Sequence, residues 1–193
     1  MTTEIIKINA KGPEPDKIKY AAEAVKKGKL VVFPTETVYG IAAYTKNKKA
    51  IERLRKLKER PKAPFSYHIA LKSDLKELSC IIDRNTKKII DKFWPGPLTL
   101  VLPTKSGKNI GVRMPAHHVA AAFLKKTGPW VVAPSANFKG QAPATDACQA
   151  VKDLNGLVDI IIDAGKTKAG ISSTVLDMTQ DPPKVLRQGS VKI

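Results

Sequence analysis

The sequence predicts an α/β domain whose sheet mixes parallel and antiparallel strands. Apolar segments of strand length alternate with amphipathic segments of helical length along most of the chain, an order typical of a layered α/β fold. Near the C-terminus, strand-like segments follow one another without a helix between them, which favours antiparallel pairing there. A chain of 193 residues fits one domain with a sizeable core. We therefore expect one compact domain over residues 1–193.

Helix boundaries in the first third are marked by proline, glycine and asparagine. A helix opens at Pro15 and ends at Gly28, where a left-handed cap is expected. Asn47 caps a second helix, which carries Lys58 and Arg60 just past its last turn. Apolar side chains recur on one face of each helix, namely Ile18, Ala21, Ala22 and Val25 on the first and Ile51, Leu54 and Leu57 on the second.

The other elements follow from the spacing of apolar residues. Apolar runs of strand length predict strands over 5–8, 30–33, 67–71, 98–102, 111–114, 130–133, 160–163, 173–177 and 184–186. Segments with helical spacing predict helices over 74–78, 86–93, 117–126 and 145–154.

The net charge of +17 comes mostly from lysines scattered through the predicted helices and loops. Such a charge favours anionic partners such as nucleotides, pyrophosphate or RNA. No run of lysines is dense, and aromatic residues do not interleave with them as they do in stacking platforms for single strands. A dedicated RNA-binding face and a solvated lysine-rich surface are both consistent with this pattern.

The two cysteines and the N-terminus bear on cellular location. Cys80 and Cys148 lie far apart, with no histidines placed to complete a zinc site. We expect no disulfide and no protein-bound metal, with both cysteines buried in a protein of a reduced compartment. No basic N-terminal region precedes an apolar run, and no apolar run reaches the ~18 residues that span a bilayer. The sequence therefore predicts a cytoplasmic protein without membrane association.

Familiar nucleotide-binding motifs are missing. The stretch 165–167, Gly-Lys-Thr, looks like the end of a phosphate-binding loop, but Ile160 stands where its first glycine is required. There is no Gly-x-Gly-x-x-Gly, and the pair His117-His118 lacks a third metal ligand at a plausible spacing. A nucleotide would have to bind through another arrangement.

Three segments at the ends of predicted elements offer such an arrangement. The stretch 33–40, Phe-Pro-Thr-Glu-Thr-Val-Tyr-Gly, follows an apolar strand, at the carboxyl end where open sheets bind small ligands. Lys58 and Arg60 can neutralise a polyphosphate, while Ser135 and Asn137 can orient its oxygens. Basic residues at a helix end and polar residues in a turn also occur without a ligand. These patterns alone leave both interpretations open.

Together the three segments resemble the YrdC-like family, the threonylcarbamoyl-AMP synthases. Similar segments extend over nearly the whole chain, at 94–99 (Trp-Pro-Gly-Pro-Leu-Thr), 112–115 (Val-Arg-Met-Pro), 170–175 (Gly-Ile-Ser-Ser-Thr-Val) and 186–189 (Leu-Arg-Gln-Gly). The resemblance implies an open, twisted, mixed sheet flanked by helices, with a concave basic cleft. It also implies an L-threonylcarbamoyladenylate synthase, which condenses L-threonine, bicarbonate and ATP and releases pyrophosphate. The product would then serve a tRNA threonylcarbamoyl transferase complex.

The resemblance also implies roles for particular residues. Those implied to surround L-threonine are Thr37, His68, Arg113 and Ser173. Those implied to surround ATP are Lys58, Arg60, Ser135, Asn137 and Arg187, with Lys58 and Arg60 as the catalytic cations. Magnesium is implied to accompany ATP. The residue types suit this chemistry, because the planar fork of Arg113 fits a carboxylate, and hydroxyls at Thr37 and Ser173 can recognise the threonine hydroxyl.

The chain departs from the family pattern in the loop 61–67. This loop is one residue shorter than in many members and lacks an asparagine that often helps to hold ATP there. In extent, the chain is similar to the single-domain members of the family.

Two other functions are open at this point. One is a YrdC-like RNA-binding protein without synthase activity, which would bind RNA in a salt-dependent manner; the resemblance itself also allows weak binding of tRNA or double-stranded RNA. The other is the carbamoyl-adenylate domain of hydrogenase maturation proteins. The zinc-finger and acylphosphatase segments of those proteins have no counterpart in this sequence.

Overall fold

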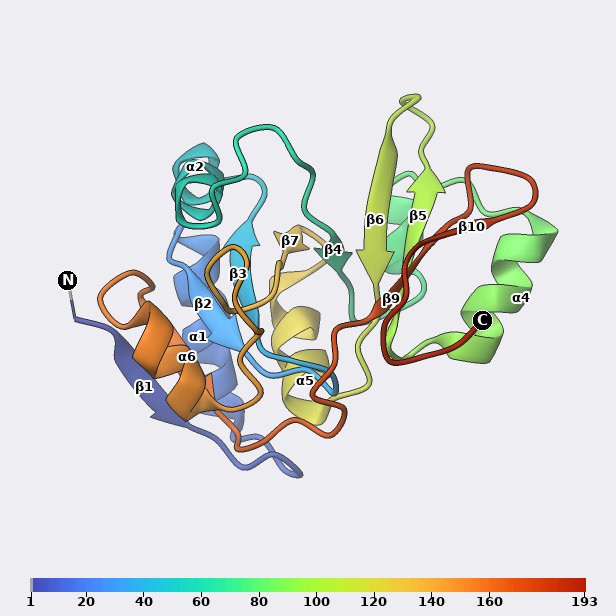
Figure 1. Ribbon diagram of the computed structural model, residues 1–193. Helices are drawn as coiled ribbons and strands as arrows, with labels where there is room; N and C mark the ends of the chain where they lie inside the picture. Colours follow the sequence, from blue (N-terminus) through green and yellow to red (C-terminus); the bar gives the residue numbers. More distant parts are fainter. Residues whose placement is uncertain (1) are drawn as a thin grey trace.

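The computed structural model describes residues 2–193, whose strands form one 10-stranded sheet (Figure 1). The strands are β1 (Glu4–Lys7), β2 (Val31–Phe33), β3 (Gly40–Tyr44), β4 (Tyr67–His68), β5 (Leu98–Pro103), β6 (Asn109–Arg113), β7 (Val131–Val132), β8 (Ile160–Asp163), β9 (Thr174–Asp177) and β10 (Lys184–Arg187). The helices are α1 (Pro15–Lys26), α2 (Lys48–Leu57), α3 (Asp74–Glu77), α4 (Arg84–Phe93), α5 (His118–Thr127) and α6 (Ala147–Leu154). The order β1-β8-β2-β3-β7-β4-β6-β5-β9-β10 contains parallel and antiparallel neighbours. The predicted mixed sheet flanked by helices is confirmed.

Helices cover both faces of one half of the sheet. Val31 and Phe33 of β2 pack with α1 and α5, whereas Val32 packs with α2 and α6 on the opposite face. In β8, Ile161 likewise faces away from the core of α1 and α5. Because both faces are buried, these strands are continuous apolar runs rather than alternating ones.

The other half of the sheet has a separate core that includes residues of α3 and α4; Figure 1 shows α4 beside this half. Leu98 and Leu100 of β5 pack there with Ile90 of α4. The short strand β4 joins the halves, because it pairs antiparallel with β7 and parallel with β6. Its His68 therefore lies in register with Arg113 of β6 on one side. This junction is where the ligand-binding candidates gather.

The strand β3 is absent from the sequence prediction. It pairs antiparallel with β2, so the stretch 34–39 connects two strands of a hairpin. Residues 40–43 are all buried and include two alanines, so no polar and apolar alternation marks the strand. The strand β4 is shorter than the predicted 67–71, because Asp74 Oδ2 accepts from Ala70 N at 3.1 Å and from Leu71 N at 2.9 Å. Other predicted elements are present, with ends shifted by a residue or two.

The expectation that both cysteines are buried is wrong for Cys148, which is exposed on α6. The buried face of α6 is formed by Ala147, Ala150 and Leu154, and helical spacing places Cys148 outside that face. Cys80 is half-buried. No helix within residues 2–193 combines the length and apolar character needed to cross a bilayer.

Candidate active site

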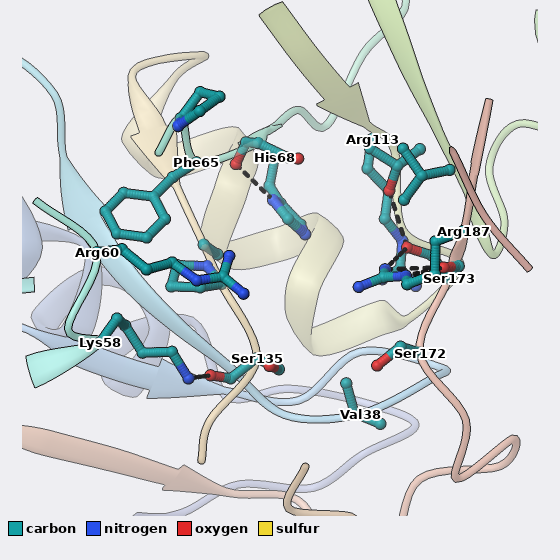
Figure 2. A pocket seen from close by; sticks show the side chains of 16 residues that line it. Val38, Lys58, Arg60, Phe65, His68, Arg113, Ser135, Ser172, Ser173 and Arg187 are labelled. Atoms are coloured by element: carbon teal, nitrogen blue, oxygen red, sulfur yellow. Dashed lines mark hydrogen bonds between the residues drawn. The ribbon is translucent and has the colours of Figure 1, made fainter. Parts of the chain in front are cut away.

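A cavity of about 230 Å³ lies at the junction of the two halves of the sheet (Figure 2). Among the predicted ligand-binding residues, those that line it are Lys58, Arg60, His68, Arg113, Ser135, Ser173 and Arg187. Figure 2 shows Lys58, Arg60 and Ser135 on one side, and Arg113, Ser173 and Arg187 on the other. The cavity therefore has two basic ends.

Two predicted residues lie behind the cavity wall rather than on it. Thr37 is 0% exposed and accepts a hydrogen bond from Arg113. Asn137 is 7% exposed and accepts a hydrogen bond from Lys58. Each residue therefore contacts a cation that lines the cavity.

The Lys58 ammonium is held by the turn that follows β7. Lys58 is 3% exposed at the C-terminal cap of α2. Its Nζ donates to the Ser135 carbonyl at 2.9 Å, to the Asn137 carbonyl, and to Asn137 Oδ1 at 3.2 Å. Ser135 Oγ donates to the same Oδ1 at 2.6 Å. Burial, and then the charge of Arg60, lowers the pKa of Lys58 to about 8.

The end of α2 is a backbone motif that places Arg60 beside the cavity. Glu59 has a φ of 49°. Its N–H donates to the Lys56 carbonyl at 3.2 Å, while the Arg60 N–H donates to the Arg55 carbonyl at 3.0 Å, the pattern of a Schellman termination. Arg55 Nη1 then donates to three carbonyls of the loop 60–63 at 3.0 to 3.2 Å. The helix end and Arg55 together fix the loop that carries Arg60.

We expect Glu59→Gly to raise the free energy of unfolding by about 0.5–1 kcal/mol, because glycine adopts a positive φ without steric cost. Urea unfolding measures the change. The control is Lys56→Gly inside the last turn of α2, which should lower stability by about 1 kcal/mol. A loss of stability in Glu59→Gly would contradict the explanation by backbone conformation.

Arg113 is a second buried cation of the site, and two side chains of the stretch 33–40 contact it. It ends β6 and is 4% exposed. Its Nη2 donates to Thr37 Oγ1 at 2.7 Å and lies 2.9 Å from Glu36 Oε1 in an ion pair. Within residues 2–193, its buried Nε has no hydrogen-bond partner. Arg113 also lines the cavity, so donors of its guanidinium that the protein does not use can bind a ligand oxygen there.

His68 supplies a hydrogen-bond acceptor between the two basic ends. Its Nδ1 lies 3.2 Å from the Ser66 carbonyl; a carbonyl only accepts, which assigns the hydrogen to Nδ1 and a lone pair to Nε2. Burial, and then the charge of Arg113, lowers the pKa of His68 to about 3. The imidazole is therefore neutral near pH 7.

Arg187 is held against the start of β9. Its Nε and Nη2 donate to the Ser173 carbonyl at 3.1 and 2.8 Å. Ser173 Oγ lies 2.8 Å from Thr99 Oγ1. Partial burial, with the charges of Arg113 and Arg60, lowers the pKa of Arg187. The two basic ends therefore influence each other electrostatically.

The cavity lining contains Lys58, Arg60, Arg113 and Arg187 but no carboxylate. Glu36, the acid paired with Arg113, is not on the lining. Like charges held close together repel one another, and a bound anion relieves that cost. Among residues 2–193, no three His, Cys, Asp or Glu side chains cluster closely enough to hold a metal ion. The site therefore fits anionic ligands and does not fit a magnesium ion coordinated by protein carboxylates.

The sequence analysis named the cations and several of their partners, such as Thr37 and Asn137, but it missed Glu36, Arg55 and Phe65. Glu36 lies between two threonines of the stretch 33–40. An acid in such an otherwise uncharged stretch could have indicated a partner for one of the cations. Arg55 gave no such signal, because its partners are backbone carbonyls of a loop. Phe65, which lies under the Arg55 guanidinium at 5.4 Å and lines the cavity, was also missed.

Comparison with known proteins identifies the family. Residues 23–189 match the Sua5/YciO/YrdC family, which is described as "Telomere recombination". The chain belongs to this family. It is 40% identical over 187 residues to the threonylcarbamoyl-AMP synthase of Pyrococcus abyssi (strain GE5 / Orsay), a match that covers 92% of this chain and 55% of that protein. It is 37% identical over 185 residues to the threonylcarbamoyl-AMP synthase of Bacillus subtilis (strain 168), covering 90% and 54% respectively.

A solved structure supports the same relationship. The crystal structure of P. abyssi Sua5 complexed with L-threonine aligns with a TM-score of 0.91 at 39% identity, over 97% of this chain and 58% of that one. The predicted family and fold are confirmed. The chain spans about half the length of these curated relatives.

Proposed function

We propose that this Sua5/YciO/YrdC protein is an L-threonylcarbamoyladenylate synthase, which condenses L-threonine, bicarbonate and ATP into threonylcarbamoyl-AMP and pyrophosphate. Family membership and the names of its relatives support the proposal. The observation that carries it is the cavity lining, which has cations at both ends and no carboxylate. One end suits a polyphosphate and the other suits a carboxylate.

The ATP subsite of this proposal is formed by Lys58, Arg60, Ser135 and Asn137 at one end of the cavity, with Arg187 contributing from the opposite end, beside Ser173 (Figure 2). The Ser135–Asn137 turn gives the Lys58 ammonium a fixed position, and the Schellman end of α2 fixes the backbone from which the exposed Arg60 side chain extends. Charges that are already in place need little reorganisation when negative charge develops on the phosphates. Asn137 acts through Lys58 and Ser135 rather than from the cavity surface.

The threonine subsite of this proposal is formed by Thr37, His68, Arg113 and Ser173. Arg113 binds the α-carboxylate with the part of its guanidinium that Glu36 and Thr37 do not occupy. The Nε2 lone pair of His68 accepts from the amine or hydroxyl of the amino acid, and the Ser173 hydroxyl adds a second polar contact. Thr37 contributes from behind Arg113.

The chemistry needs no protein nucleophile. The threonine amine nitrogen bonds to the carbon of carbon dioxide and loses a proton to solvent, which gives a carbamate. With bicarbonate, a C–O bond of bicarbonate breaks as the C–N bond forms, and the departing hydroxide leaves as water with the proton from the amine. A carbamate oxygen then attacks the α-phosphorus of ATP, and the bond to the bridging oxygen breaks to release pyrophosphate. With a pKa of about 3, His68 hydrogen-bonds the substrate and is too weak a base to hold this proton. Lys58 and Arg60 neutralise the charge that develops on the phosphates.

Magnesium and protein partners follow from this chemistry. Because the cavity lining lacks carboxylates, magnesium would enter on the ATP phosphates rather than on protein ligands. The product is a mixed anhydride that must be passed to a tRNA threonylcarbamoyl transferase complex, with direct contact to tRNA at most weak. We place this reaction in the cytoplasm.

The test is a three-substrate assay on the purified protein. With ATP, labelled bicarbonate and L-threonine, we expect a labelled adenylate and an equal amount of pyrophosphate, both dependent on threonine. Salt-sensitive RNA binding without adenylate formation would instead identify an RNA-binding protein.

We expect Arg113→Lys to raise the KM for threonine at least about tenfold and to change the KM for ATP less than threefold, because lysine keeps the charge but loses the planar fork. Steady-state kinetics with each substrate varied in turn measures the two effects. Equal changes in both KM values would place Arg113 outside the amino-acid subsite.

The pH profile should report the ionisation of Lys58. In the unliganded protein its pKa is about 8, so the ammonium charge is present below pH 8 and is lost above it. We expect kcat/KM for ATP to fall as pH rises through this value. Threonine and bicarbonate also titrate in this range, so the control is Lys58→Arg, whose charge persists and whose profile should lack that fall. Identical profile shapes in the two proteins would contradict the assignment.

A further inference from the structure

A chain of buried hydrogen bonds leads from Arg113 to the backbone of Val38. Arg113 Nη2 donates to Thr37 Oγ1 at 2.7 Å. The hydroxyl oxygens of Thr37 and Thr35 lie 2.9 Å apart, and Thr35 Oγ1 lies 2.6 Å from the Val38 carbonyl. Thr35 and Thr37 are 2% and 0% exposed, so solvent does not compete for these bonds.

The direction of each bond follows from the number of hydrogens available. A carbonyl oxygen only accepts, so the single hydroxyl hydrogen of Thr35 is used on Val38. In the contact between the two hydroxyls, Thr37 must then donate and Thr35 must accept. Backbone N–H groups of Thr37 and Val38 point at Thr35 Oγ1 from 3.3 Å, which also requires an acceptor there. With its hydrogen used, Thr37 presents oxygen lone pairs to Arg113.

We propose that Thr35 is a positioning residue for threonine binding, because it fixes the hydrogen-bond direction of Thr37 and, through Thr37, the guanidinium of Arg113. A Thr37 hydroxyl turned the other way would aim its hydrogen at a cation. Glu36 Oε1 lies 2.9 Å from the same Nη2 and adds an ion pair to this contact. These contacts keep the guanidinium of Arg113, a residue that lines the cavity, in one orientation for a carboxylate. This inference deepens the proposed function and rests on it, since the ligand of Arg113 is taken to be L-threonine.

The first test compares two substitutions at Thr35. Valine keeps the shape but removes both the acceptor for Thr37 and the donor to Val38, whereas serine keeps the hydroxyl. We expect Thr35→Val to raise the KM for threonine at least about fivefold with the KM for ATP within about twofold, and Thr35→Ser to remain within about twofold for both. The separation of the two KM values and the rescue by serine would not follow from a general loss of packing.

Thr104 provides a matched control for Thr35→Val. Thr104 Oγ1 lies 2.9 Å from Ser106 Oγ and donates to the Lys108 carbonyl at 2.7 Å. This is the same arrangement of hydroxyls and carbonyl, on the β5–β6 connection and outside the cavity lining. Thr104→Val should leave both KM values within about twofold of the wild type. Equal effects of Thr35→Val on the two KM values, or failure of serine to rescue, would overturn the proposal.

The second test reads the hydrogen-bond direction in the wild-type protein and needs neither a variant nor activity. Neutron diffraction from deuterated crystals should place the deuterium between the two threonine oxygens on Thr37, and that of Thr35 toward the Val38 carbonyl. A Thr35 deuterium directed at Thr37 would overturn the inferred direction. If the wild-type protein makes adenylate without requiring threonine, the proposed function fails, and the link from Thr35 to threonine binding fails with it whatever the neutron result.

Discussion

Lys58→Ala is expected to lower threonine-dependent pyrophosphate release at least about a hundredfold, since removing one preorganised electrostatic group costs about 10²–10³ in kcat. The side chain has two roles that alanine abolishes together. Its charge lies at the end of the cavity that we propose for the phosphates, and its Nζ organises the turn through the carbonyls of Ser135 and Asn137. The Asn137 carbonyl would lose this donor, while the Ser135 carbonyl would keep only the Asn137 N–H, and this loss adds to that of the charge.

The control for this prediction is Lys56→Ala, which removes an exposed lysine from the same helix two residues earlier. Its rate should stay within about twofold of the wild type, as expected for a surface substitution. Thermal unfolding of Lys58→Ala confirms that the variant is folded under assay conditions. If the folded variant keeps near wild-type turnover, Lys58 is a capping residue of α2 without a role at the phosphates.

Local chemistry explains why most of the fold was predictable. Asn47 accepts from Ala50 N at 3.0 Å as the cap of α2, and Pro15 opens α1 as expected. The failure at β3 has a different origin, because that strand is buried on both faces and its alanines give no periodic signal. Its existence depends on pairing with β2 and β7, which is long-range information.

The same distinction applies to the site. The residue types at the ends of predicted elements left two interpretations open, and the family resemblance selected the candidate residues; seven of them do line one cavity. Their orientation depends on contacts between distant segments, such as Arg113 with Glu36 and Lys58 with the Ser135 carbonyl. Backbone carbonyls are common to all residues, so a sequence gives no sign of which ones surround a lysine.

The backbone of Gly189 fixes one basic end of the cavity. Its N–H donates to Thr174 Oγ1 at 3.0 Å. A Cβ at this position would overlap the backbone of Ser172, Ser173 and Thr174, including a distance of 2.5 Å to Thr174 N. These are backbone atoms at the start of β9, which cannot move aside as a flexible side chain can. To relieve the overlap, the C-terminal segment 188–193, which begins next to Arg187, must move away from β9.

Gly189→Ala is therefore expected to lower the free energy of unfolding by about 1–3 kcal/mol, as overpacking does, and the melting temperature by about 2–4 °C for each kcal/mol. Arg187 donates a hydrogen bond to the Ser173 carbonyl. Displacement of the segment 188–193 from Ser173 therefore also moves the Arg187 cation out of the cavity. Turnover measured well below the melting temperature should fall at least about tenfold. Gly12→Ala is the matched control, since a Cβ at Gly12 meets nothing within 4 Å, and it should change neither quantity. Reduced stability with full turnover in Gly189→Ala would show that Arg187 acts independently of the segment 188–193. If neither the stability nor the turnover changes, the close approach of Gly189 to the backbone of β9 is not needed.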